Sequence, residues 1–244
     1  EQFSMTIMTA MILAFVINAL WWLACTLPLL KNYKQNYYVE DMQKDKLRGS
    51  FRRLADSFRK IRKHRKIFLF LIAFFFYIDG VYTIIDMATA YGSALGLDTQ
   101  GLLVALLVTQ IVAFPSALVF AALARKINNA KLIQICILAY TGIAVFAIQL
   151  DKQWEFWVLA VCVGLFQGGI QALSRSYFAQ IIPPENAGEF FGLFDICGKG
   201  AAFLGTALVS LTAQLSGSAN GAIAILAVMF IIGLFLFNRA LRVE

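Results

Sequence analysis

Long apolar runs separated by short polar connections make up almost the whole chain. Each run holds about 20 residues or more, enough for an α-helix to cross the hydrocarbon core of a bilayer. The pattern therefore predicts an all-α integral membrane protein with seven transmembrane helices. We expect these helices at residues 5–30, 67–91, 99–123, 132–150, 155–182, 189–215 and 219–241.

Composition supports a membrane protein and argues against a soluble enzyme. The chain is 60% apolar and 14% charged, whereas soluble domains are about 25% charged. Its four cysteines lie apart within apolar runs, and its one histidine, His64, lies among Lys and Arg residues. Neither arrangement resembles a metal or redox site, and the sequence has no G-x-S-x-G or H-E-x-x-H motif. We therefore expect no cofactor, no metal and no enzymatic activity.

Most of the positive charge is concentrated in residues 31–66. This segment carries 13 Lys/Arg against 4 Asp/Glu, whereas the whole chain has a net charge of +7. Because Lys and Arg accumulate in cytoplasmic loops, we expect the segment to be cytoplasmic. The other loops follow the same bias, which places the N-terminus of the chain outside and its C-terminus in the cytoplasm.

Within the basic segment, apolar residues recur at helical spacing with cations between them. Phe51, Leu54, Phe58 and Ile61 form this apolar stripe. Such a helix suits an anionic membrane surface, so membrane lipids are an expected partner of residues 44–66. The alternative is a topology anchor that joins two helical bundles. No nucleic-acid partner is expected, because the segment is tied between two spans.

Charged residues inside the predicted spans are the strongest candidates for function, because a charge in hydrocarbon is costly. Counting 1.5 Å per residue from the cytoplasmic edge puts Asp79 and Lys199 near the midplane, ~18 Å and ~15 Å deep. Arg175 and Asp195 share the inner third of the membrane in the same way. Each layer thus holds one acid and one base, whereas Asp86 falls near the outer surface, where solvation accounts for it.

Two interpretations of these charges remain open. In one, the pairs only hold helices together, and Asp195 can also pair with Lys199 four residues along the same helix. In the other, the charges bind substrate or a coupling proton and exchange partners between conformations. Asp79 is the residue on which the second interpretation most depends.

Polar and small residues accompany the charges. Gln167 and Gln171 lie on one helical face with Arg175, where amides suit a small polar ligand or an interhelical hydrogen bond. Tyr77, two residues before Asp79, is a further candidate for substrate or proton binding. Four glycines suit gating or close packing between helices: Gly168, Gly169, Gly192 and Gly198.

Three stretches together resemble one family of transporters. They read FFFYIDGVYTII at residues 74–85, FQGGIQALSRSYFAQIIP at residues 166–183 and GEFFGLFDICGKGAAFLG at residues 188–205. They are similar to the C-terminal half of the autophagy-related vacuolar amino-acid effluxers and their bacterial relatives, within the major facilitator superfamily. The family's first-helix signature, an aromatic residue followed by Asp-Trp-Ala, has no counterpart in the chain.

The resemblance implies a twelve-helix transporter in which this chain corresponds to helices 6 to 12. Residues 1–30 then form the last helix of the N-terminal half, residues 31–66 the cytoplasmic loop between halves, and residues 67–244 the C-terminal six-helix bundle. The implied partners are the N-terminal half, an amino-acid-like small molecule and protons. The implied activity is secondary transport by alternating access, in the cell membrane of a bacterium or the vacuolar membrane of a fungus.

Other functions remain open beside transport of small polar solutes. A lipid or amphiphile translocator of the same fold would need an apolar lateral opening, which the aromatic run at residues 74–76 is suited to line. A structural scaffold would leave the midplane charges with no role beyond pairing. A non-transporting sensor or an intramembrane enzyme has no supporting motif in the sequence.

Overall fold

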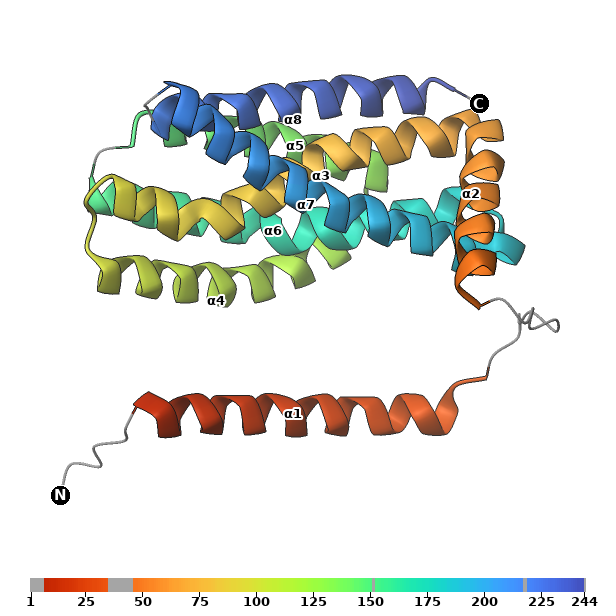
Figure 1. Ribbon diagram of the computed structural model, residues 1–244, viewed down its shortest axis with the longest axis horizontal. Coiled ribbons are helices and arrows are strands. Elements are labelled where there is room, and N and C mark those ends of the chain that lie inside the picture. Colours follow the sequence, from red (N-terminus) through yellow and green to blue (C-terminus); the bar gives the residue numbers. More distant parts are fainter. Residues whose placement is uncertain (1–6, 35–45, 151, 217–218, 244) are drawn as a thin grey trace. The chain divides into compact units, whose positions relative to one another are not determined.

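The computed structural model describes residues 7–34, 46–150, 152–216 and 219–243, and helices are the only regular elements among them (Figure 1). The long helices are α1 (Ile7–Asn32), α2 (Lys46–Lys63), α3 (Arg65–Ala94), α4 (Thr99–Leu123), α5 (Asn129–Ile148), α6 (Gln153–Ile181), α7 (Ala187–Ser216) and α8 (Ala219–Leu241), with a 3-10 turn at Pro184–Asn186. Within the described residues, seven helices are long and apolar enough to cross a membrane. The predicted all-α fold with seven spans is confirmed, and the chain is a multi-pass membrane protein.

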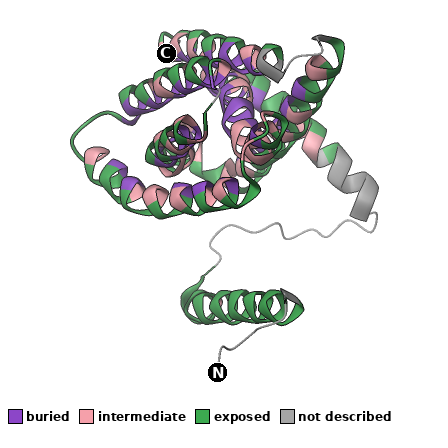
Figure 2. Cartoon of the chain, turned by 90° about the vertical axis from the view of Figure 1, so that its left-hand side faces the viewer, coloured by how far each residue is buried: buried purple, intermediate pink, exposed green. Residues whose placement is uncertain are grey.

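The chain divides into two compact units, residues 1–46 and 47–244. In the first unit, α1 exposes nearly all of its described side chains (Figure 2). These side chains are apolar around the whole circumference, with Trp21 and Trp22 about 70% exposed. A helix that is apolar on every side has no face suited to water, as a membrane span requires.

The second unit is a bundle of six long helices. Within it α4 packs on α6, α3 packs on α8 and α7, and α5 packs on α8 and α6. Stacked aromatic rings fill the core near one end, where Phe74 lies 4.0 Å and Phe178 lies 4.9 Å from Phe194, between ring centroids. Aromatic pairs of this kind stabilise a fold by about 0.5–1.5 kcal/mol beyond the burial of their area.

Glycines set how closely the helices approach. A Cβ on Gly164 would lie 2.6 Å from the carbonyl oxygen of Thr109, and one on Gly168 would lie 2.9 Å from Ala117 Cβ. The G-x-x-x-G spacing on α6 therefore holds α4 in direct backbone contact, as small residues do between membrane helices. The Thr109 hydroxyl then reaches across and donates to the Ala160 carbonyl at 3.2 Å.

Residues 46–63 of the basic segment form α2, which lies across one end of the bundle (Figure 1), whereas residues 35–45 lie outside the described part of the chain. Ile61 of its apolar stripe is buried, whereas Phe58 is half exposed; the side chain of Phe51 lies outside the described part of the chain. The Ser57 hydroxyl and the Lys60 ammonium both donate to Glu189 Oε2 on α7, each at 3.0 Å. These two bonds dock α2 on the bundle itself.

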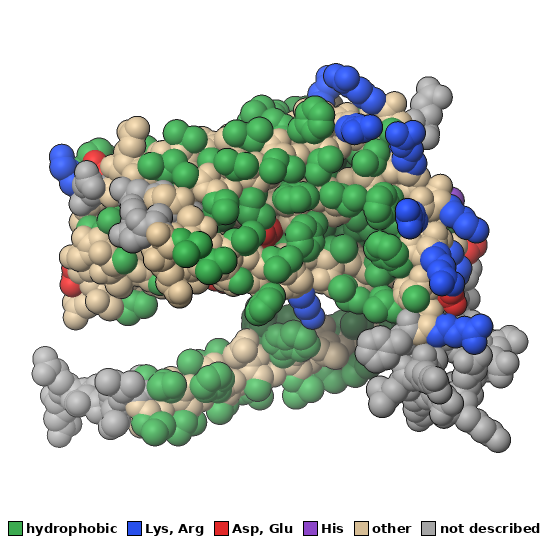
Figure 3. Space-filling model, turned by 45° about the horizontal axis from the view of Figure 1, so that its top comes forward, with side chains coloured by type: hydrophobic (Ala, Val, Ile, Leu, Met, Phe, Trp, Pro, Cys, Tyr) green, Lys and Arg blue, Asp and Glu red, His purple; other side chains and the backbone are tan. Residues whose placement is uncertain are grey.

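Cations gather at the bundle end that carries α2, beside a flank covered by hydrophobic side chains (Figure 3). The connection after α4, with Arg125 and Lys126, shares this end because helices α3 and α4 run in opposite directions. The last turn of α8, with Arg239, ends there as well. One end of the bundle is therefore strongly basic.

Candidate functional site

A hollow lies on the bundle surface between α3, α6 and α7. Its volume is about 320 Å³. The residues that line it are Phe74, Ile78, Tyr82, Gly168, Gln171, Ala172, Arg175 and Phe194. Aromatic and aliphatic walls with a few convergent polar groups are typical of sites for small molecules.

The polar centre of this hollow is an ion pair between α6 and α7. Arg175 Nη2 lies 2.6 Å from Asp195 Oδ1, so the guanidinium donates a charge-assisted hydrogen bond to the carboxylate. The guanidinium carbon also lies 5.8 Å from the ring centroid of Phe194, within range of a cation–π interaction. The residues that sequence depth placed in one layer therefore meet in space.

The exposure of this pair is unusual for a membrane helix. The Arg175 side chain is 61% exposed and the Asp195 side chain 51%, although both lie within helices of membrane-spanning length. Charges of this kind are costly against lipid and normally face a bundle interior or a water-filled cavity. A water-accessible setting for this pair therefore fits its chemistry better than contact with lipid.

Two glutamines extend the polar face of α6 from Arg175. Gln171 lines the hollow, one turn from Arg175. Gln167 lies a further turn along, and its buried Oε1 has no hydrogen-bond partner among the described residues. A buried amide oxygen without a hydrogen bond is destabilising, and Gln167 does not line the hollow.

Asp79 occupies a different environment, inside the bundle between α3 and α7. Its side chain is fully buried. Oδ1 accepts a long hydrogen bond of 3.5 Å from the Thr83 hydroxyl, whereas Oδ2 has no partner in the described part of the chain. The carboxyl packs against Gly205 so closely that a Cβ there would overlap both Asp79 Oδ1 and Thr83 Oγ1.

The structure does not bring Asp79 and Lys199 together. Lys199 is exposed, four residues beyond Asp195, whereas Asp79 faces Gly205 one to two turns further along α7. None of the ion pairs among the described residues includes Asp79 or Lys199. Equal depth along two helix axes places two residues at one height, but it does not turn them toward one another.

Tyr77 and the glycines take structural positions. The Tyr77 ring is fully buried, and its hydroxyl lies 2.7 Å from Ser174 Oγ on α6. Gly168 and Gly169 pack beneath α4, where Cβ atoms would lie 2.9 Å from Ala117 Cβ and less from the Phe120 ring. The two remaining glycines differ. A Cβ on Gly198 would lie 3.6 Å from the Phe74 ring, whereas a Cβ on Gly192 would project into open space.

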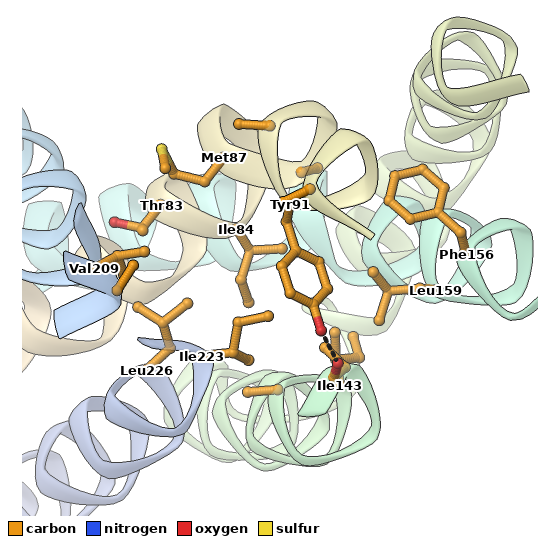
Figure 4. Close-up of a pocket in the computed structure, with 16 residues that line it drawn as sticks. Thr83, Ile84, Met87, Tyr91, Ile143, Phe156, Leu159, Val209, Ile223 and Leu226 are labelled. Carbon is orange, nitrogen blue, oxygen red and sulfur yellow. Dashed lines mark hydrogen bonds between the residues drawn. The ribbon is translucent and has the colours of Figure 1, made fainter. Parts of the chain in front are cut away.

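A second, almost wholly apolar cavity lies deeper in the bundle, with a volume of about 160 Å³ (Figure 4). Side chains from α3, α5, α6, α7 and α8 surround it, among them Met87, Ile143 and Leu226. The Tyr91 hydroxyl closes one side by donating to the Ala147 carbonyl at 2.8 Å. Thr83, whose hydroxyl donates to Asp79, is also one of the residues that line this cavity.

Sequence reasoning missed several residues that shape these sites. Thr83 lies one helical turn from Asp79, so the i, i+4 spacing could have identified it. Gly205 and Phe194 come from another helix, and no spacing within one span indicates that they contact Asp79 and Arg175.

Comparison with known proteins agrees with a bundle of membrane helices. The family described as vacuole effluxer Atg22 like matches residues 2–243. An uncharacterized MFS-type transporter, YxiO of Bacillus subtilis, is 42% identical over 234 residues, which cover 96% of this chain and 54% of that protein. Autophagy-related protein 22 of Saccharomyces cerevisiae is 34% identical over 170 residues, covering 65% of this chain and 32% of the relative.

The chain therefore spans about half the length of these relatives, or less. The match nevertheless runs through every helix of the bundle, including the stretches that carry Asp79, Arg175 and Asp195. The chain belongs to the Atg22-like vacuole effluxer family of major facilitator transporters.

Proposed function

We propose that the chain supplies the C-terminal half of a secondary transporter that moves amino acids or similar small polar solutes by alternating access, coupled to protons. The observation that carries the proposal is the Arg175–Asp195 pair, more than half exposed within membrane-length helices. Sites of secondary transporters lie at the interface between two halves; by sequence depth this pair would lie in the inner third of the membrane, on the cytoplasmic side of the midplane. The N-terminal half of the transporter is the partner that would cover the hollow.

The chemistry of the hollow matches a zwitterionic solute. The guanidinium of Arg175 is suited to bind a carboxylate, and the carboxylate of Asp195 is suited to bind an ammonium group. When an amino acid binds, its carboxylate would take the place of Asp195 beside Arg175, and its ammonium group would take the place of Arg175 beside Asp195. Neither residue would then be left without an opposite charge. Gln171, which lines the hollow one turn from Arg175, would supply a hydrogen bond to the same solute.

Asp79 is the residue we assign to the coupling proton. An ionised carboxylate buried with no cation beside it would be strongly destabilising, so this packing suits the neutral acid. Losing the proton would favour a different contact between α3 and α7. Exposed Lys199, on the same helix as Gly205, is a candidate counter-charge for such a second state.

The charge distribution supports an orientation. The basic end, which carries α2 and the connection after α4, would lie in the cytoplasm, with the N-terminus of this chain outside. The relatives suggest two membranes. The higher identity to the Bacillus subtilis protein favours a bacterial cell membrane, whereas the likeness to the fungal proteins would suit a vacuolar membrane.

The test is a transport assay on the full transporter in liposomes with an imposed pH gradient. Labelled amino acids should accumulate, and an Arg175→Gln variant should lose that accumulation. A lipid or amphiphile translocator would instead move a labelled phospholipid between leaflets and ignore the amino acids. Absence of amino-acid uptake under both gradient directions would overturn the proposal.

A further inference from the structure

An apolar groove flanks α7 near the basic end of the bundle, and nothing in the transport proposal uses it. Its volume is about 160 Å³ and no polar surface lines it. Phe58 of α2 closes the groove toward the basic end, and the other walls are Phe68, Leu71, Phe75, Leu193 and Cys197.

The groove is built by a contact between α2 and α3. The rings of Phe58 and Phe68 meet edge to face, with centroids 6.1 Å apart and an interplanar angle of 81°. Phe58 is nevertheless 51% exposed, so half of the ring remains available to a further apolar group. The docked position of α2 is fixed independently by the bonds of Ser57 and Lys60 to Glu189.

The groove lies at the depth of the acyl chains in one leaflet of a bilayer. Its residues on α3 run from Phe68 to Phe75, whereas α3 begins at Arg65. At 1.5 Å per residue this covers roughly 5 to 15 Å from the basic end of the helix. In a bilayer whose hydrocarbon core is about 30 Å thick, that interval lies among the acyl chains of one leaflet, below its headgroups.

Two arginines, Arg62 and Arg65, lie one helical turn from groove residues in the sequence, toward the end where a lipid headgroup would be. Arg62 follows Phe58 by one turn on α2, and Arg65 precedes Phe68 by one turn at the start of α3, so each adjoins a groove residue on its own helix face. Both arginines are exposed, and the ion pairs among the described residues include neither of them. An apolar groove with two exposed arginines one helical turn from its lining residues is complementary to an amphiphile with an anionic head.

From this juxtaposition we propose that the groove between α2, α3 and α7 binds one anionic phospholipid. One acyl chain lies against Phe58, Phe75 and Cys197, and the phosphate is held by Arg62 and Arg65. The bound lipid would fasten α2 to the bundle at the membrane surface. This site is separate from the Arg175–Asp195 hollow and holds whether or not the protein transports amino acids.

The test measures lipid binding by native mass spectrometry of the delipidated transporter titrated with phosphatidylglycerol or phosphatidylcholine. Phosphatidylglycerol should bind more tightly, and each arginine replaced by glutamine should weaken it roughly fivefold. The double variant Arg62→Gln/Arg65→Gln should therefore lose most of the preference for the anionic lipid. Arg52→Gln/Lys63→Gln is the matched control, because it removes the same charge from another face of α2.

The acyl chain is located separately with phosphatidylglycerol that carries a photoreactive diazirine in one tail. Adducts should map to peptides containing residues 68–75 or 193–197, and Cys197→Phe, which fills the groove, should suppress them. Equal binding of the two lipids, an equal loss in both double variants, or adducts confined to other helices would each overturn the proposal. Glycerol phosphate that competes for binding as effectively as the whole lipid would also contradict the proposal. The groove would then contribute nothing to the affinity for the lipid.

Discussion

Asp79 and Asp195 are both acids within membrane-spanning helices of one bundle, yet their surroundings are opposite. Asp195 is half exposed and pairs with Arg175 beside a hollow. Asp79 is fully buried, has Thr83 as its hydrogen-bond donor and has no cation beside it in the described chain. An exposed, paired acid can exchange its partner for a ligand, whereas a buried, unpaired acid can exchange only a small particle such as a proton.

The largest effect is expected from neutralising the buried acid. Asp79→Asn keeps the shape of the side chain but cannot ionise, so accumulation driven by a pH gradient should be abolished. Counterflow of labelled against unlabelled substrate should persist, because it needs no net proton movement. Asp86→Asn, an exposed acid on the same helix, is the control and should leave both activities intact. Full gradient-driven accumulation by Asp79→Asn would remove this residue from coupling.

The exposed pair should affect substrate binding more than stability. Arg175→Ala and Asp195→Ala each remove one charge-assisted contact of about 1.5–3 kcal/mol, so kcat/KM should fall about 10- to 100-fold. The free energy of unfolding should change by less than about 1 kcal/mol, because the pair is exposed. Kinetics in liposomes and thermal unfolding of the same samples separate the two effects.

Arg125→Ala, which removes a cation from the connection after α4, provides the matched control for that comparison. Unchanged kinetics in both alanine variants would show that the pair only fastens α6 to α7. Restored transport in the charge-swapped Arg175→Asp/Asp195→Arg variant would point to the same structural role.

Two glycine variants on α7 test how tightly the buried acid is packed. Gly205→Ala places a methyl group against Asp79 and Thr83 and should destabilise the fold by about 1–3 kcal/mol through overpacking. Gly200→Ala, on the same helix, meets nothing within 4 Å and should be neutral or stabilising, since alanine favours a helix. Thermal unfolding in one detergent measures both variants, and equal melting temperatures would contradict the tight contact at Gly205.

The smallest effect is expected at Tyr77. Tyr77→Phe removes the hydroxyl that lies 2.7 Å from Ser174 Oγ but keeps the buried ring. Ser174 still bonds the Ile170 carbonyl, so the loss of stability should be about 1 kcal/mol and transport should continue. Loss of transport without loss of stability would instead place Tyr77 in the mechanism.

The fold could be predicted from the sequence because membrane spans are set by length and apolarity alone. The predicted span at residues 67–91 and the helix Arg65–Ala94 differ by only a few residues at each end. The same arithmetic placed Arg175 and Asp195 at one depth, and they do meet. The same depth estimate predicted that Asp79 pairs with Lys199, but the ion pairs among the described residues include neither of them.

The difference has a geometric cause. Depth fixes the height of a residue along its helix, whereas contact also depends on the direction of the side chain and on how the helices cross. Because α7 crosses α3 obliquely (Figure 1), Asp79 meets Gly205 rather than Lys199. Contacts between helices, such as Arg175 over Phe194, are set by this crossing and leave no periodic signal in the sequence.

Cysteine labelling at Gln171 measures whether the Arg175–Asp195 hollow is a water-accessible substrate site. In a background without native cysteines, Gln171→Cys should react with a membrane-impermeant thiol reagent, and the transported amino acid should slow that reaction. Phe235→Cys, on an apolar exposed face of α8, should stay unlabelled. Absence of labelling at residue 171, or labelling that the amino acid does not slow, would contradict the account.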